Sequence, residues 1–240
     1  MTDLHTHILP GMDDGPRSPE EALALLEAQR SQGVTQVALT SHYHPELEPL
    51  DRFLARREAA FAQLMALCPP GLTLKRGCEV YFTPEILSIE AEKLCLEGTS
   101  VLLLELPVLQ KPAFLREVLT GLRSRGITVL LAHAERYQYV RNDPALLCAW
   151  KDLGALIQLS SGAVRSDGLT RRLIKWGLAD VLASDAHSIR HRPPDLKEGL
   201  HALDSETART LQRNAGLLFS GKEIPKRRYQ APKKVLGFWL

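Results

Sequence analysis

Short apolar runs alternate with longer amphipathic stretches along most of the 240 residues. Apolar runs of this length, separated by helical patterns, are typical of repeated strand–helix units and a parallel sheet. Seven such units predict an α/β fold that forms a closed or nearly closed (β/α)7 barrel, with an open doubly wound sheet as the alternative. The predicted strands are Asp3–His7, Val34–Ser41, Thr73–Glu79, Val101–Leu106, Thr128–His133, Ala155–Ser160 and Asp180–Ser184.

Helix signals fill the intervals between these strands. The first helix is the clearest, because Ser18 is a favourable N-cap and Pro19 suits the first helical position. Glu21 completes a capping box with Ser18, and Gly33 follows the expected end. Further helices are predicted over Arg52–Leu67, Ala113–Arg125 and Glu206–Phe219, with two more helix starts at Thr83-Pro84 and Asp143-Pro144.

The composition fits a folded globular protein, with 45% hydrophobic and 24% charged residues. No apolar run reaches the length of a membrane span, and we find no signal-peptide pattern, so we expect a cytoplasmic protein. The formal net charge of +2 predicts no nucleic-acid partner for the body of the chain. The cysteines form no CxxC pair, so we expect reduced packing residues. They are Cys68, Cys78, Cys95 and Cys148.

Positive charge is concentrated in the last twenty residues. They carry a net charge of +5, so the other 220 residues together carry −3. We therefore predict a domain over residues 1–220 and an extended basic, aromatic tail over residues 221–240. Such a tail could dock on anionic lipid, and a disordered solubilising tail is the alternative. Its charged residues are Lys222, Glu223, Lys226, Arg227, Arg228, Lys233 and Lys234.

Histidines and carboxylates gather where the predicted strands end. His5 and His7 occupy alternate positions of the first strand and so share one face. Asp185 and His187 repeat this spacing at the last strand. Both candidate architectures bind ligands at the carboxyl ends of strands. Six of the seven strands end in such a residue: His5 and His7, His42, Glu79, Glu105, His133, and Asp185 with His187.

A shared metal centre would explain these polar strand ends. Glu105 is the most telling, because a carboxylate inside the apolar run Val101–Leu106 needs a buried partner; a salt bridge is its alternative explanation. His5 and His7 alone could be a chance pair, and Asp185 and His187 a structural hydrogen bond. With Asp14 included, the candidates number five histidines and four carboxylates, which suit three ions with one bridging carboxylate. Mixed imidazole and carboxylate ligation favours Mn, Fe or Zn over Mg or Ca.

Three further residues lie close to this predicted centre in the sequence. Arg136 follows His133, and its guanidinium could meet a phosphate, with an ion pair to Glu135 or Asp143 as the alternative. His44 is expected in a loop near the mouth of the site. Asp3 is expected to orient a ligand histidine without binding metal itself.

The motifs resemble, in order along the chain, those of the PHP (polymerase and histidinol phosphatase) superfamily. More closely, they resemble the bacterial metal-dependent protein-tyrosine phosphatases of capsule and exopolysaccharide loci. The basic, aromatic ending Lys233-Lys234-x-x-Gly237-Phe238 is similar as well. The motifs are Asp3-x-His5-x-His7, Asp13-Asp14-Gly15, Thr40-Ser41-His42, Gly77-x-Glu79, Glu105, His133-x-Glu135-Arg136, Gln158, and Ser184-Asp185-Ala186-His187 followed by Arg192-Pro193.

The resemblance implies a distorted (β/α)7 barrel with a trinuclear centre, usually credited to manganese. Arg136 and Arg192 would bind the phosphate. Two departures, Ser188 in place of a common asparagine and the segment Tyr43-His44-Pro45, concern specificity more than ligation. The implied ligand sets are His5, His7, Glu79 and Asp185 for the first metal, Glu79, Glu105 and His133 for the second, and Asp14, His42 and His187 for the third.

The implied activity is hydrolysis of phosphotyrosine by a metal-activated hydroxide. The expected substrate is a membrane-associated tyrosine kinase of capsule synthesis, and the tail could dock on the same kinase. A phenolate leaving group, with a parent pKa near 10, needs less protonation than an alkoxide, and His44 is the candidate general acid. No cysteine has an arginine six residues later, which disfavours a cysteine-dependent phosphatase. The alternatives are a phosphatase of a small ester such as histidinol phosphate and a non-catalytic regulator that binds phosphoproteins.

Overall fold

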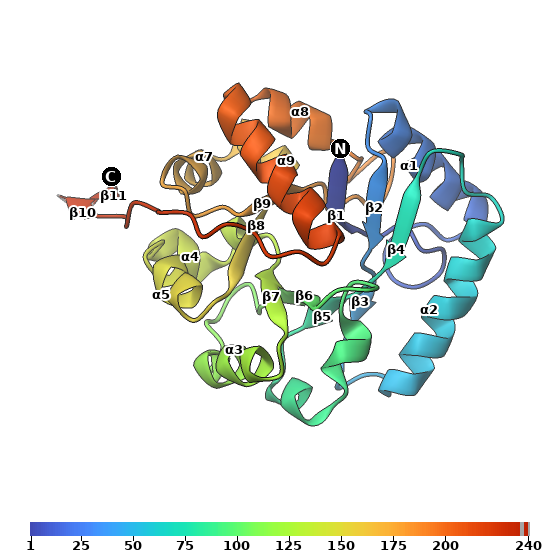
Figure 1. The fold of residues 1–240 in the computed structure, drawn as a ribbon, viewed down its shortest axis with the longest axis horizontal. Coiled ribbons are helices and arrows are strands. Elements are labelled where there is room, and N and C mark those ends of the chain that lie inside the picture. Colours follow the sequence, from blue (N-terminus) through green and yellow to red (C-terminus); the bar gives the residue numbers. More distant parts are fainter. Residues whose placement is uncertain (236–237, 240) are drawn as a thin grey trace.

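The computed structural model describes residues 1–235 and 238–239, and its centre is a set of parallel strands surrounded by helices (Figure 1). One sheet has the order β1 (Thr2–Thr6), β2 (Gln36–Leu39) and β4 (Thr73–Arg76). The second has the order β3 (His42–Tyr43), β5 (Glu79–Tyr81), β6 (Val101–Glu105), β7 (Thr128–Leu131), β8 (Leu156–Ser160) and β9 (Val181–Ala183). The predicted parallel α/β architecture is thus confirmed, but the described strands β1 to β9 form two sheets and not one continuous closed barrel.

The two sheets meet at one edge of β1. Beyond the end of β9, Ala186 forms a parallel bridge with Thr6, and the His7 amide donates to the Ala186 carbonyl at 2.8 Å. The Asp185 amide donates to the His5 carbonyl at 2.9 Å. These bonds place the first and last candidate ligand pairs side by side, although they are about 180 positions apart in the sequence.

Two predicted strands end earlier than expected, and a break separates each of them from the next strand. Within Val34–Ser41 the structure has β2, and β3 begins at His42, beyond the predicted end. Thr73–Glu79 contains β4, and only its last residue belongs to β5. Backbone bonds close the breaks, because Gly77 donates to the carbonyl of Leu39 and Glu79 to those of residues 40 and 41. Each break lies just before a candidate ligand, and it shifts His42 and Glu79 into the second sheet as paired neighbours.

The helices form an outer layer, and the longer ones were predicted to within two residues. The Ser18 hydroxyl accepts from the Glu21 amide as expected, but Glu21 accepts from the Arg17 amide, so the predicted reciprocal capping bond is wrong. Thr83 caps a 3₁₀ turn. The elements are α1 (Pro19–Ser31), α2 (Leu50–Met65), η1 (Pro84–Ser88), η2 (Ala91–Leu94), α3 (Leu115–Ser124), η3 (Ala134–Arg136), α4 (Gln138–Asn142), α5 (Leu146–Asp152), α6 (Ser161–Ser166), α7 (Gly168–Lys175), α8 (Leu196–His201) and α9 (Ser205–Phe219).

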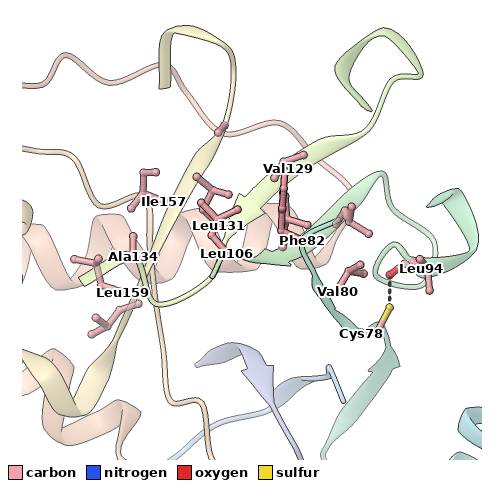
Figure 2. Packing of buried hydrophobic residues seen from close by; sticks show 14 of the residues in the cluster. Cys78, Val80, Phe82, Leu94, Leu106, Val129, Leu131, Ala134, Ile157 and Leu159 are labelled. Carbon is pink, nitrogen blue, oxygen red and sulfur yellow. Dashed lines mark hydrogen bonds between the residues drawn. The ribbon is translucent and has the colours of Figure 1, made fainter. Parts of the chain in front are cut away.

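Strands β6, β7 and β9 are apolar on both faces, as parallel strands covered by helices should be. Along β6, Val101 and Leu103 belong to a small inner cluster, whereas Leu102 and Leu104 belong to the large cluster under the helices. Figure 2 shows part of the large cluster. Phe219, at the end of α9, also belongs to the inner cluster. The inner cluster includes Leu4, the residue before His5, and Leu103, which pairs with Glu79.

The tail leaves α9 and runs along the outside of the body as extended chain (Figure 1). The Gln230 amide donates to the Trp176 carbonyl at 2.8 Å, and the Tyr229 hydroxyl donates to Asp152 at 2.7 Å. Strands β10 (Lys234–Val235) and β11 (Phe238–Trp239) then pair antiparallel. Gly237, part of the predicted basic, aromatic ending, lies outside the described residues. In the part of the chain that the structure describes, no helix combines the length and apolarity needed to cross a membrane.

Candidate metal centre and phosphate-binding site

The nine candidate ligands converge at the carboxyl ends of the strands, and Glu79 lies at the centre of the group. One of its oxygens, Oε2, is 3.2 Å from both His5 Nε2 and His7 Nε2 and 3.1 Å from His42 Nδ1. Its other oxygen is 2.9 Å from His133 Nε2. Glu79 is 1% exposed, so these four contacts are buried. A carboxylate with both oxygens directed at imidazoles has the geometry of a bridging ligand.

Two groups share Glu79. The first contains His5 and His7, whose Nε2 atoms are 3.0 Å apart, with Asp185 Oδ1 at 3.3 Å from His5 and 3.5 Å from His7. In the second, Glu105 Oε1 lies 3.5 Å from His133 Nε2. These contacts bring together the first two ligand sets that the resemblance implies.

The third group surrounds Asp14 at the more open side of the centre. Asp14 Oδ1 lies 3.2 Å from His187 Nε2 and 3.5 Å from His42 Nε2. His7 belongs to the same group by distance, since one ligand atom of each of these four residues lies within 4.8 Å of the others. Glu79, Glu105 and His42 also meet this criterion, so His42 lies between the second and third implied sets.

Hydrogen bonds to neighbouring acceptors orient three of the imidazoles. His5 Nδ1 is 3.1 Å from Gln158 Oε1, and His7 Nδ1 is 2.8 Å from Asp13 Oδ2. His187 Nδ1 likewise lies 2.9 Å from a backbone carbonyl, that of residue 185. With a proton on Nδ1 donated to these acceptors, each ring directs the lone pair of Nε2 into the centre. This is the arrangement that metal-binding histidines usually have.

The buried acceptors of the centre lack donors. Both oxygens of Glu79 and Oδ1 of Asp185 have no hydrogen-bond partner among the described residues. An unpaired buried carboxylate is costly, and a divalent cation removes that cost. Burial alone would raise the pKa of Glu79, but His5 and the other rings hold it well below its ordinary value. Burial opposes charge on His7 too, yet its hydrogen bond to Asp13 and the nearby charge of Glu79 raise its pKa to about 10. Positive charge on His5 and His7 thus balances the buried carboxylates as a cation would, and the donor set fits divalent metals.

The backbone is unusual at or beside three of the candidate ligands, His5, His133 and Asp185. His133 and Asp185 adopt left-handed conformations, with φ of 29° and 56°. The register between β1 and β2 shifts between Asp3 and Thr6, which places one extra residue on β1 beside His5. Non-glycine residues at positive φ and bulged strands are concentrated at functional sites, where they redirect side chains. Here the bulge lets Leu4 join the inner core while the next residue still faces the metal centre.

Two arginines lie beside the cluster and share one of its carboxylates. Arg136 Nη2 donates to Asp185 Oδ2 at 2.7 Å, and Arg192 Nη2 donates to the same oxygen. Arg192 Nη1 is 2.9 Å from His187 Nε2. The alternative partner Glu135 is farther from Arg136, at 4.0 Å. Both guanidiniums line a cavity of about 480 Å³ beside the metal centre. The cavity offers an anion two forked donors next to the cluster.

A family model for capsular polysaccharide synthesis proteins of the CpsB/CapC type matches residues 1–218. The chain belongs to the CpsB/CapC family. It is 30% identical to the tyrosine-protein phosphatase YwqE of Bacillus subtilis over the full length of both chains. It is also 29% identical to the tyrosine-protein phosphatase CpsB of Streptococcus pneumoniae, over 82% of this chain and 87% of that one.

Solved structures agree with this CpsB/CapC membership. A structure from work on YwqE and CpsB, described as metal-dependent tyrosine phosphatases, superposes with a TM-score of 0.87 at 26% identity. It covers 97% of this chain and 100% of that one. The phosphotriesterase of Mycobacterium tuberculosis, at 15% identity and a TM-score of 0.51, shows a likeness of fold alone.

Sequence reasoning missed the role of Asp13 in this CpsB/CapC site. Its Oδ2 accepts from the amide of His42 at 2.9 Å and also contacts His7, so it joins two candidate ligands. Gly15 is required beside it, because a Cβ at that position would lie 2.2 Å from the carbonyl oxygen of His7. The signal was present in the motif Asp13-Asp14-Gly15, in which only Asp14 was considered as a ligand.

Asp3 supports the site differently from the prediction. It is fully buried and accepts from the Ser184 amide at 3.0 Å and from Gln29 Nε2 at 2.7 Å. It reaches the backbone amide of His5 and not its ring. Asp3 therefore fixes β1 to β9 and α1, and it acts on His5 through the backbone and not through the ring.

We expect Asp3→Ala to lower the free energy of unfolding by about 3 kcal/mol, because it leaves several buried donors without an acceptor. Urea unfolding of the metal-free protein would measure the loss. Glu27→Gln, at an exposed ion pair with Arg30, is the control and should change the value by less than about 0.5 kcal/mol. Equal stability of both variants would contradict the supporting role of Asp3.

Proposed function

We propose that this chain is a metal-dependent protein-tyrosine phosphatase, built on a distorted (β/α)7 barrel over residues 1–220. The observation that carries the proposal is the contact of Asp185 with both halves of the site. Its Oδ1 faces His5 and His7, while its Oδ2 accepts from Arg136 and Arg192. A metal cluster and a phosphate site that share one carboxylate suit a phosphomonoester, whose phosphoryl oxygens need both.

Three divalent ions are proposed, with manganese as the metal and iron or zinc as the alternatives. Bound there, they would supply a hydroxide nucleophile at neutral pH and neutralise phosphoryl oxygens. The first would be held by His5, His7, Glu79 and Asp185, the second by Glu79, Glu105 and His133, and the third by Asp14, His42 and His187.

The remaining residues of the site bind the phosphate and handle a proton. Arg136 and Arg192 would donate charge-assisted hydrogen bonds to the phosphoryl oxygens as their negative charge shifts during the reaction. His44 lies at the mouth, with its ring centroid 6.0 Å from that of His42. It is the proposed proton donor to the leaving oxygen. A phenolate needs this help less than an alkoxide, which favours phosphotyrosine as substrate.

The experiment that tests this function compares two substrates. The proposed enzyme should have a clearly higher kcat/KM on a phosphotyrosine peptide than on histidinol phosphate, and chelation of metal should abolish both activities. A preference for histidinol phosphate would favour a small-ester phosphatase instead. A protein that purifies without metal although all nine ligands are present would favour the non-catalytic regulator.

A cytoplasmic enzyme of a capsule locus would meet its substrate at the membrane, and we propose a membrane-associated tyrosine kinase as that substrate. The capsule-synthesis family and the names of the relatives support this choice. The tail over residues 221–240 is proposed to hold the enzyme near it. Its lysines and arginines are exposed along the extended segment, as a contact with anionic lipid or with the kinase requires.

Truncation after Gly221 is expected to weaken binding to vesicles containing phosphatidylserine by at least about tenfold, since each basic residue near an anionic surface contributes about 1 kcal/mol. Vesicle co-sedimentation at low and high salt would measure it. Hydrolysis of p-nitrophenyl phosphate should be unaffected, because the metal centre is at the other end of the strands. Unchanged binding to vesicles and to the kinase would refute the docking role.

A further inference from the structure

An aromatic pair lies directly above two of the candidate ligands. His42 pairs with Glu79 in the parallel register of β3 and β5, and the next residues, Tyr43 and Val80, pair in turn. Side chains alternate between the two faces of a strand. The residues after these, His44 and Tyr81, therefore point to the same side as the ligands and lie one layer nearer the mouth.

The side chains have the arrangement that this register predicts. The rings of His44 and Tyr81 stack with centroids 5.0 Å apart and an interplanar angle of 27°. The ring of His42 lies 6.0 Å from that of His44. Tyr81 is paired with Glu105 on its other side, so it stands between two strands that both carry candidate ligands. Both rings of the pair are only partly buried. The pair thus forms a surface at the edge of the metal centre with one side open.

The arginines lie in segments that follow other strands. Arg136 follows β7 and Arg192 follows β9, whereas the aromatic pair belongs to β3 and β5. A phosphoryl group bound by the cluster and the arginines must direct its ester substituent outward through the mouth. Aromatic rings attract one another at centroid distances of about 4.5–7 Å, by about 0.5–1.5 kcal/mol beyond the area they bury. An aryl substituent would gain this attraction from the pair, and an alkyl substituent would not.

We propose that His44 and Tyr81 form an aromatic wall that packs against the phenyl ring of phosphotyrosine and selects aryl over alkyl phosphates. This inference rests on the proposed phosphatase function and specifies which substituent the site accepts. It assigns Tyr81 as a specificity-determining residue that acts on the ring and not on the phosphoryl group.

The test is Tyr81→Leu, with Tyr81→Phe as the matched control that keeps the ring. We expect Tyr81→Leu to lower the ratio of kcat/KM for phenyl phosphate to that for phosphoserine by about tenfold, which corresponds to about 1.4 kcal/mol. Tyr81→Phe should keep the ratio near that of the unmodified protein. Inhibition by inorganic phosphate should be the same in all three proteins. An unchanged ratio in Tyr81→Leu would refute the wall, as would equal losses on both substrates.

A binding measurement separates this inference from the proposed function. Calorimetry with phenylphosphonate and methylphosphonate needs no catalysis, and the metal-loaded protein should prefer the phenyl compound. Tyr81→Leu should lose this preference and Tyr81→Phe should keep it. Absent hydrolysis together with a preference for phenylphosphonate would refute the phosphatase function and leave the wall intact. Hydrolysis without the preference would refute the wall alone.

His44→Phe distinguishes the two roles of His44, because it keeps an aromatic ring and removes the proton donor. The wall predicts that this variant retains the preference for phenylphosphonate. Loss of that preference in His44→Phe, with a stable fold, would overturn the assignment of its ring to the wall.

Discussion

Glu79→Gln is expected to reduce kcat on an aryl phosphate by about a thousandfold and to remove two of the three proposed metals. Glu79 contacts the rings of His5, His7, His42 and His133 at 2.9–3.2 Å, more imidazoles than any other candidate carboxylate contacts. A glutamine has nearly the same shape but carries no charge, and it presents an amide N–H₂ group where the cluster needs an acceptor. The loss of several kcal/mol of electrostatic stabilisation corresponds to the expected factor.

The number of metal ions bound by Glu79→Gln is the most direct test of this prediction. The proposed set Asp14, His42 and His187 does not include Glu79, so one metal should remain when metal content is measured by mass spectrometry. Glu97→Gln is the control, because it also removes a carboxylate that pairs with a cation, here Arg76, outside the centre. It should retain three metals and nearly full activity. A Glu79→Gln protein with three metals would show that Glu79 is not a bridging ligand.

The convergence of the candidate ligands was predictable because it depends on one rule. Parallel strands covered by helices are apolar on both faces, so the change from leucines to Glu105 at the end of β6 marks a site even without coordinates. The same reasoning located His133 and Asp185 at their strand ends. Alternation also placed His5 and His7 on a common face, and their Nε2 atoms meet at 3.0 Å.

The fine geometry was not predictable, because tertiary contacts determine it. The breaks before His42 and Glu79 depend on backbone bonds between segments that are distant in sequence. The bulge on β1 appears only when this strand is paired with β2. The left-handed backbone at His133 and Asp185 contradicts their intrinsic preferences, and the surrounding structure maintains it. These features decide which oxygen or nitrogen faces the centre, which no periodicity reveals.

Asp185 contacts both the candidate metal centre and the two arginines, and it therefore determines where the arginines lie. Its Oδ2 holds Arg136 and Arg192 together, although both guanidiniums carry a positive charge. Burial would raise the pKa of Asp185, but His5 and Arg136 hold it far below its ordinary value. The carboxylate therefore stays ionised and brings both forks to the same side of the cluster, where a phosphoryl group can accept from them.

The double variant Arg136→Met/Arg192→Met is expected to lower kcat/KM on an aryl phosphate by about a thousandfold, and each single variant by about 10- to 100-fold. Each guanidinium group supplies charge-assisted hydrogen bonds to the phosphoryl group, and such bonds contribute about 1.5–3 kcal/mol of stabilisation. The two effects should not add exactly, because both arginines share Asp185 and would share the phosphoryl group. A coupling free energy of at least about 0.5 kcal/mol is expected from the double-mutant cycle.

Two measurements separate phosphate binding from mere neutralisation of Asp185. Inhibition by inorganic phosphate should weaken together with kcat/KM, while the metal content should stay at three. Arg136→Lys is the matched control: it keeps the charge but loses the planar fork, so it should fall between the unmodified protein and Arg136→Met. If metal content falls in parallel with activity, the arginines act by stabilising the ligand Asp185, and their assignment to the phosphate is wrong.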